Sequence, residues 1–592
     1  MYTPEGETRQ GEYALDIAVK SVDYFSQFFS TPYTLPKLDL VAVPDFYIGA
    51  MENWGLLTFR ETALLLHPSK GTQRARQYVS ILVTHEIAHQ WFGNLVTLEW
   101  WDQLWLKEGF ATWISFLAVD RLCPDLDSWS QFLTGERLLA LELDCLASSH
   151  PIEIPDGVKH PGQIDEIFDD ISYSKGASII HMLYMWLGED AFKAGLHLYL
   201  SRHRNGAAKT QDLWEAVEEA SGQPVARVMG DWTRVQGFPL VTVELLEEEG
   251  LVKLSQASTS AASPGHFWHV PLLLEVRGGG GEVLESRQIL LQETEVELQL
   301  ELPPGACLVV NAGQTSFCRV RYSCHLLTKL HHLLPLLPAR DRLGILSDLA
   351  DCALAAKEEL EPLIDTLKHY SGEVTWPVLQ ALLQVLYKLE GLVEATPAWS
   401  GFLQLAYGVL RPSLAKLGWE SEEGEEAGQI MARGAVIGRL GRLGCNETVG
   451  RAWVAWRREQ EGRGEVAADL RQAVYDTVAR AGGSLEVAAL VDKYEKGDGA
   501  DEKRLVLAAL GQAREQEEVL AWVLGDTVKS QDKVFVVAGV AGSGAEGRSR
   551  AWGWFKTQAD TLLGLYTRWG VIYSFCYSTR RECSLDATFF FF

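Results

Sequence analysis

The sequence lacks the features that would place this chain in a membrane or on a nucleic acid. No uninterrupted apolar run reaches about 18 residues, so we expect no membrane span. Lysine and arginine number 53, against 79 aspartates and glutamates, which gives a formal net charge of −26. Because a field of that sign repels phosphate backbones, nucleic acid is excluded as an expected partner.

Cysteine is present but without a useful pattern. The nine cysteines are scattered, their number is odd, and no C-x-x-C pair occurs. This excludes a disulfide framework and a thiolate zinc site, and it fits a reducing compartment. The first twenty residues also lack a basic stretch followed by an apolar one, which a signal peptide needs. We therefore expect a cytoplasmic chain, although a helical pattern that begins almost at once leaves open a lost upstream segment with a signal or anchor.

The length predicts several domains, because 592 residues are too many for one hydrophobic core. Residues 1–237 have mainly helical spacing with a few strands, and residues 238–323 are short alternating runs between turns, which is typical of a small β domain. Residues 324–570 are helical again, in units typical of stacked helical hairpins. Residues 571–592 fit no helical repeat and end in four phenylalanines, so we predict an aberrant tail.

The elements expected in the first part of the chain follow from apolar periodicity. Helical spacing recurs over 12–30, 74–92 and 103–121, and strand-like runs occupy 38–43 and 56–59. The predicted fold class is therefore multidomain α+β: a mainly helical domain with a small sheet, then a small β-sandwich, then an α-helical solenoid.

Residues with metal chemistry are concentrated between His85 and Glu108. His85-Glu86-Ile87-Ala88-His89 is an H-E-x-x-H pattern, and residues four apart share one face of a helix. Both imidazoles can therefore bind one metal ion, while Glu86 can reach a water on that ion without binding the ion itself. Glu108, on the next predicted helix, would complete a His₂Glu ligand set with one position open for water. The sequence thus predicts a hydrolytic site with one Zn²⁺ per chain and Glu86 as general base.

Three separated motifs occur in a fixed order in this chain. They are Gly49-Ala50-Met51-Glu52-Asn53 followed by Trp-Gly, then HEIAHQWFGNLVTLEWW, then LWLKEGFATW. Together they closely resemble the GAMEN-type (gluzincin) zinc aminopeptidases, and the flanking segments look most like the puromycin-sensitive branch. The resemblance rests on specific motifs over roughly residues 1–322 and is architectural beyond them. It implies a thermolysin-like catalytic domain and a HEAT-like helical domain.

The resemblance also implies a role for each matching residue. His85, His89 and Glu108 would bind zinc, and Glu86 would be the general base and later the proton shuttle. Tyr173, in ISYSKGA, matches the tyrosine that donates to the tetrahedral oxyanion. Glu52 would bind the free α-ammonium group of a peptide, which makes the enzyme an exopeptidase of broad specificity. The remaining residues of the GAMEN segment would shape the substrate cleft: Gly49, Ala50, Met51 and Asn53.

Some features depart from the family pattern and leave alternatives open. We expect that the family's N-terminal β domain, which closes one side of the cleft, is absent, and that the helical domain is truncated. A non-catalytic peptide-binding fragment is therefore one alternative, although Glu86 and Tyr173 are intact. The bifunctional leukotriene-hydrolase branch is another; it is weaker because that branch has GGMEN where Ala50 gives GAMEN here. The sequence predicts neither the oligomeric state nor the preferred N-terminal residue.

Overall fold

The computed structural model describes residues 1–592 except 47, 247–250, 356–358, 498 and 566–592, so the predicted tail at 571–592 lies outside the described residues. The chain forms two compact units, each built from separate segments. Unit 1 consists of Met1–Ile17, Leu38–Val83 and Ser371–Phe592, and unit 2 consists of Ala18–Lys37 and Thr84–Tyr370. The chain is thus multidomain and mainly helical with small sheets, as expected. The division at residues 237, 323 and 570 stays a prediction.

The helices predicted from apolar spacing are present. α1 spans Glu12–Phe28, α3 spans Gln73–Ala88 and α4 spans Trp105–Leu122. Later helices of unit 2 are α8 (Gly176–Leu187), α9 (Glu189–His203), α10 (Thr210–Ser221) and α11 (Val225–Arg234). Within the described part of the chain, every helix is too short or too polar to cross a bilayer.

Helices α4 and α8 approach each other closely in unit 2. A Cβ atom added to Gly109 of α4 would lie 2.9 Å from the Cα atom of Gly176 and 3.0 Å from the carbonyl oxygen of Ser172. Only glycine permits this backbone approach. It brings the first turn of α4 against η6, a π-helical turn at Ile171–Lys175 that leads into α8. These two elements carry Glu108 and Tyr173.

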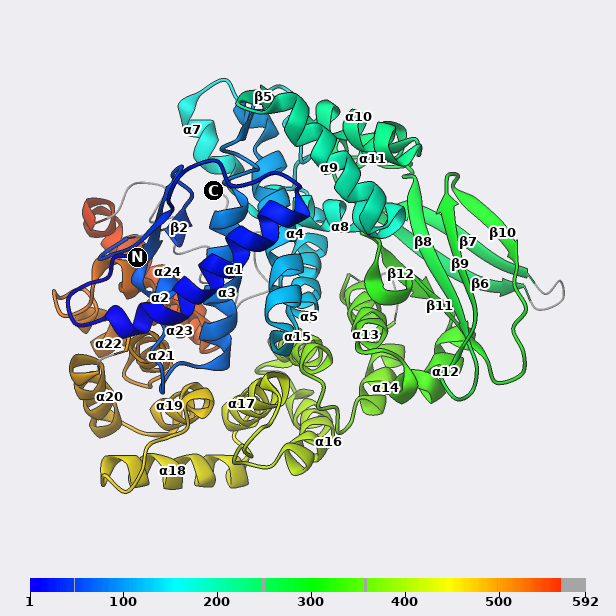
Figure 1. The fold of residues 1–592 in the computed structure, drawn as a ribbon. Helices are drawn as coiled ribbons and strands as arrows, with labels where there is room; N and C mark the ends of the chain where they lie inside the picture. The colour runs from blue at the N-terminus through cyan, green and yellow to red at the C-terminus, as the bar shows by residue number, and fades with distance from the viewer. Residues whose placement is uncertain (47, 247–250, 356–358, 498, 566–592) are drawn as a thin grey trace. The chain divides into compact units, whose positions relative to one another are not determined.

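The described residues of 239–322 form seven strands in two sheets, drawn in green in Figure 1. The first sheet has the order β10-β7-β6-β12 and the second β11-β8-β9. The strands are β6 (Pro239–Leu246), β7 (Leu251–Ser258), β8 (Val270–Arg277), β9 (Val283–Leu291), β10 (Glu295–Gln299), β11 (Cys307–Val310) and β12 (Arg319–Tyr322). The Tyr322 hydroxyl accepts a hydrogen bond of 2.9 Å from the Val310 N–H, so the two sheets are in contact. The alternating or β-rich runs of the sequence predicted all of these strands except β12.

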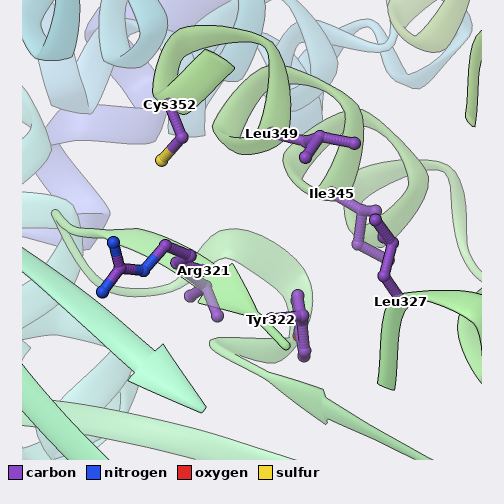
Figure 2. Close-up of a pocket in the computed structure, with 7 residues that line it drawn as sticks. Arg321, Tyr322, Leu327, Ile345, Leu349 and Cys352 are labelled. Atoms are coloured by element: carbon purple, nitrogen blue, oxygen red, sulfur yellow. The ribbon is translucent and has the colours of Figure 1, made fainter. Parts of the chain in front are cut away.

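Three helices follow the strands within unit 2: α12 (Cys324–Leu333), α13 (Ala339–Leu354) and α14 (Glu361–His369). The Asp348 carboxylate of α13 accepts a hydrogen bond of 2.9 Å from the Val320 N–H of β12. A small pocket lies between β12, α12 and α13, and Figure 2 shows the mainly apolar side chains that line it, Leu327, Ile345 and Leu349 among them. None of its lining residues is a predicted site residue.

Unit 1 combines a small early sheet with the late helices. Its strands are β1 (Asp39–Val43), β2 (Ala50–Met51) and β3 (Leu56–Arg60), in the order β1-β3-β2. The late helices are α15 (Trp376–Val393), α16 (Trp399–Leu417), α17 (Ala427–Arg442), α18 (Asn446–Gln460), α19 (Arg471–Ala481), α20 (Ser484–Lys496), α21 (Ala500–Gly511), α22 (Gln516–Trp522), α23 (Lys533–Gly542) and α24 (Ala545–Leu565). Each contacts its neighbour in sequence, and α15, α17, α19, α21 and α23 also contact one another in series (yellow to orange in Figure 1). This is the pattern of stacked helical hairpins.

Polar contacts join the early and late segments of unit 1. The Arg60 guanidinium lies 3.0 Å from the Asp532 carboxylate, and the Gln73 N–H donates to the Asp469 carboxylate at 2.7 Å. The Thr72 N–H donates to the Asp501 carboxylate at 3.2 Å. These contacts span several hundred residues of sequence, so unit 1 can be completed only when both ends of the chain are present.

Candidate active site

The predicted metal-binding histidines lie at the end of α3 in unit 2. His85 is in the last turn of the helix, and His89 follows the helix end at Ala88, still hydrogen-bonded through its N–H to the His85 carbonyl at 3.3 Å. This backbone bond keeps the spacing of one helical turn, and the two Nε2 atoms lie 3.0 Å apart. Both side chains are buried. The helix therefore presents two imidazole nitrogens at one place, as the spacing predicts.

The His89 ring has a defined orientation. Its Nδ1 atom lies 2.9 Å from the Phe92 carbonyl oxygen, which can only accept a hydrogen bond. Nδ1 therefore carries the proton in the neutral ring, and the lone pair is on Nε2, the nitrogen that faces His85. A ring N–H donated to a backbone carbonyl is the usual support of a metal-binding histidine.

Glu108 completes the group from α4. Its Oε2 atom lies 3.2 Å from Nε2 of His89 and 3.5 Å from Nε2 of His85. The three ligand atoms lie within 4.8 Å of one another, and all three residues are buried. The site is buried, and its two imidazole nitrogens and one carboxylate oxygen fit a divalent cation. Catalytic zinc uses this His₂Glu ligand set. The structure therefore contains a group that can bind a metal.

The second oxygen of Glu108 faces a cation. Its Oε1 atom lies 3.0 Å from the Lys107 Nζ atom. Burial by itself would raise the pKa of the Glu108 carboxyl, but Lys107 and the two histidines outweigh it and hold that pKa well below its usual range. Glu108 is thus an anion, with Oε2 toward the histidines and Oε1 toward Lys107.

Glu86 and Tyr173 lie beside this group. Glu86 is buried on α3, and one of its carboxylate oxygens lies within 4.8 Å of a ring nitrogen of His89. Tyr173 is half-buried, and its ring is nearly parallel to the His85 ring, with centroids 6.2 Å apart and planes 12° apart. Unit 2 therefore brings together five of the predicted residues: His85, Glu86, His89, Glu108 and Tyr173. Their roles in catalysis stay predictions.

The GAMEN segment lies in unit 1. Ala50 and Met51 form β2, which pairs antiparallel with β3, and the Gly49 carbonyl accepts a hydrogen bond of 2.9 Å from the Arg60 N–H. Asn53 donates through Nδ2 to the Thr58 hydroxyl at 3.2 Å, and Glu52 between them is buried. The assignment of these five residues to the substrate cleft stays a prediction.

Sequence reasoning missed the residues that fix the Tyr173 turn, which we define as Ile171–Lys175. His150, Asp169 and Asp144 are hydrogen-bonded or ion-paired around it. His150 and Asp144 lie outside every motif, and no local periodicity links them to Tyr173.

Comparison with known proteins places the chain in a family. Residues 13–232 match the model of the peptidase family M1 domain, and residues 307–584 match that of the ERAP1-like C-terminal domain. Aminopeptidase M1-B of Oryza sativa subsp. japonica is 37% identical, over 98% of this chain and 68% of its own length.

Two further relatives come from a worm and a yeast. Puromycin-sensitive aminopeptidase of Caenorhabditis elegans is 34% identical, over 96% of this chain and 61% of its own length. Alanine/arginine aminopeptidase of Saccharomyces cerevisiae is 32% identical, over 95% of this chain and 66% of its own length. The chain thus spans about two thirds of the length of these relatives. The predicted resemblance and the enzyme class, a peptide-bond hydrolase, are confirmed: the chain belongs to the M1 family of aminopeptidases.

Proposed function

We propose that this chain is a zinc-dependent aminopeptidase that removes single N-terminal residues from peptides and binds one Zn²⁺. The observation that supports this most strongly is the buried convergence of His85, His89 and Glu108 in a chain of the M1 family. When bound, zinc supplies Lewis acidity, which acidifies a water molecule and polarises a peptide carbonyl.

The chain's own residues supply the proton transfers and the polar contacts. Glu86, adjacent to His85 on α3, accepts a proton from the attacking water and passes it to the leaving amine. Tyr173 donates its hydroxyl proton in a hydrogen bond to the oxygen that becomes negatively charged in the tetrahedral state. Such a donor strengthens its bond as charge develops, so it contributes to kcat more than to substrate binding.

The exopeptidase character is assigned to Glu52. A carboxylate that binds the α-ammonium group at a fixed distance from the metal admits one residue before the scissile bond. Gly49, Ala50, Met51 and Asn53 would line the same part of the cleft. The name of the yeast relative joins a small and a cationic residue, alanine and arginine, which supports broad specificity here as well.

Two finer assignments accompany this function. We infer the domain order thermolysin-like catalytic domain, β-sandwich and helical solenoid, which the strands at 239–322 and the helices after them support. We also infer a cytoplasmic setting, which the scattered cysteines, odd in number and without a C-x-x-C pair, support.

The test is hydrolysis of an aminoacyl-arylamide by the purified chain, with and without a zinc chelator and with added Zn²⁺. We expect activity that the chelator abolishes and zinc restores, and no hydrolysis of the N-acetylated substrate. Activity that resists the chelator would refute the metal mechanism. Equal hydrolysis of the acetylated substrate would refute the ammonium contact of Glu52.

A further inference from the structure

The Tyr173 turn is fixed by polar side chains on both sides of the tyrosine. At its start, the Asp169 carboxylate accepts hydrogen bonds through Oδ1 from the N–H groups of Ile171, at 3.1 Å, and Ser172, at 3.0 Å. The Asp169 main-chain oxygen accepts a third, of 3.0 Å, from the Tyr173 N–H. Asp169 therefore sets the direction in which the backbone enters the turn.

The other oxygen of Asp169 belongs to a pair with His150. The His150 Nε2 atom lies 2.8 Å from Oδ2 of Asp169, and its Nδ1 atom lies 2.7 Å from the Pro151 carbonyl oxygen. Both neighbours are acceptors in this arrangement, so both ring nitrogens must donate. Only the doubly protonated imidazolium ring can do this. The pair is therefore a cation and an anion joined by a short hydrogen bond.

The charge state agrees with the surroundings. Burial by itself would lower the pKa of the His150 imidazole, but its hydrogen bond to Asp169 and the charge of that carboxylate outweigh burial and raise the pKa. The Lys175 ammonium opposes this rise. Lys175 is itself fully buried against Asp144, with Nζ 2.8 Å from Oδ2.

The end of the turn is held by the segment that leads to His150. Ser174 donates to the Glu136 carboxylate at 2.6 Å, and Lys175 pairs with Asp144. The second oxygen of Asp144 accepts a hydrogen bond of 2.7 Å from the Ser149 hydroxyl, next to His150. Residues 136–150 thus hold the turn at three points, and the His150–Asp169 pair is the point directly before Tyr173.

We propose that His150 and Asp169 are positioning residues for the reaction: their pair fixes the turn so that the Tyr173 hydroxyl meets the developing oxyanion. This inference rests on the proposed function, in which Tyr173 is the oxyanion donor. Neither residue is a metal ligand or lies beside one in sequence. Loss of the pair leaves the metal group intact and allows the tyrosine to move, and a displacement of about 1 Å at a reacting group can cost about 100-fold in rate.

The experiment compares His150→Gln and Asp169→Asn with the unchanged chain, all loaded with Zn²⁺. We expect kcat to fall roughly 10- to 100-fold, with KM within about threefold and with zinc content unchanged. His266→Gln is the matched control, because His266 forms a second half-buried pair in unit 2, with Asp231 at 3.7 Å, and neither residue is a partner of the Tyr173 turn. We expect the control to keep its kcat.

A double-mutant cycle separates positioning from general damage. In a Tyr173→Phe background, His150→Gln should cause no further loss of kcat, because the hydroxyl that it positions is gone. Equal losses in both backgrounds would overturn the inference and leave the proposed function in place. A wild-type chain without chelator-sensitive activity would instead overturn the proposed function, and the kinetic part of the inference with it.

A second measurement needs no turnover. Nitrogen-15 NMR of histidine-labelled chain, assigned by comparison with His150→Gln, should show both ring nitrogens of His150 protonated at pH 7. In Asp169→Asn that state should disappear at pH 7. A His150 ring that is singly protonated at pH 7 in the unchanged chain would overturn the charged pair.

Discussion

His85 and His89 are placed by one turn of backbone, whereas the turn that carries Tyr173 is also held by side chains far from it in sequence, including His150 and Asp144. The spacing of the histidines depends on α3 and on the bond from the His89 N–H to the His85 carbonyl. The Tyr173 turn depends on partners at Asp169, His150 and Asp144. Two groups expected to act on the same substrate atoms thus have different structural supports, one local and one distributed.

The difference predicts where each group is vulnerable. A helical pair fails only when the helix or a ligand itself is changed, because backbone bonds do not depend on side-chain identity. A turn held by buried polar groups fails when any partner is removed, since the group left behind is desolvated and unpaired. Four changes to the chain test this contrast, in order of decreasing expected effect.

Glu86→Gln changes the local group without disturbing its support. We expect kcat to fall by about 10²- to 10⁴-fold, because the amide cannot accept the proton of the attacking water. Zinc measured by atomic absorption should stay at one per chain, since Glu86 is not in the ligand set. Loss of zinc in this variant would show that Glu86 is a ligand.

Lys175→Met removes the buried ion pair with Asp144 that holds the end of the Tyr173 turn. Lys175 and Asp144 are both fully buried, and removal of the cation leaves an unpaired carboxylate, which costs about 3–5 kcal/mol. Urea denaturation followed by circular dichroism measures this loss. The matched control is Lys253→Met, which removes an ion pair to the exposed Glu295 and should cost much less stability, because solvent screens an exposed pair. Equal losses in both variants would contradict the contrast.

Tyr173→Phe removes the tyrosine hydroxyl and leaves the polar contacts of the Tyr173 turn in place. We expect kcat to fall by about 10²- to 10³-fold with little change in KM, because the hydroxyl acts in the tetrahedral state. The midpoint of urea denaturation should stay near that of the unchanged chain. A rise in KM with an unchanged kcat would show that Tyr173 contacts the substrate and is not the oxyanion donor.

The smallest effect concerns α8, the helix that follows the Tyr173 turn. His181 lies in α8, and its ring packs against Trp129 and Phe132, which come earlier in the chain. Burial lowers the pKa of the His181 imidazole to about 3. The folded chain keeps the ring neutral, whereas the unfolded chain protonates it below about pH 6.5. Folding stability is therefore lost as the pH falls from about 6.5 toward 3.

His181→Leu should reduce that loss. Between pH 7 and pH 5 the unchanged chain should lose roughly 2 kcal/mol more than the variant, which urea denaturation at both pH values measures. A loss of the same size in His181→Leu and in the unchanged chain would contradict the burial of a neutral ring.

The sequence predicts what is encoded locally. Periodicity predicted α1, α3 and α4 nearly to their ends, and alternation predicted the strands from Pro239 to Gln299. The convergence of His85 and His89 with Glu108 also followed from helical spacing and one motif order. Their role as zinc ligands, like that of Glu52, stays a prediction.

The sequence does not predict what distant residues build together. The His150–Asp169 pair joins residues 19 positions apart without a shared helix or strand. The pairing of Arg60 with Asp532, which ties β3 to the late helices, joins residues 472 positions apart. Neither has a local pattern, because each depends on the tertiary fold that brings the side chains together.

The discontinuity of unit 1 has a consequence for biosynthesis. Translation at about 5–20 residues per second separates Arg60 from Asp532 by roughly half a minute to a minute and a half. During that interval the ribosome has already completed Thr84–Tyr370, the segment with the metal-binding group, while Leu38–Val83 still lacks its helical partner. The segment Leu38–Val83, which contains Glu52, therefore reaches its final surroundings only after the late helices of unit 1 have been made.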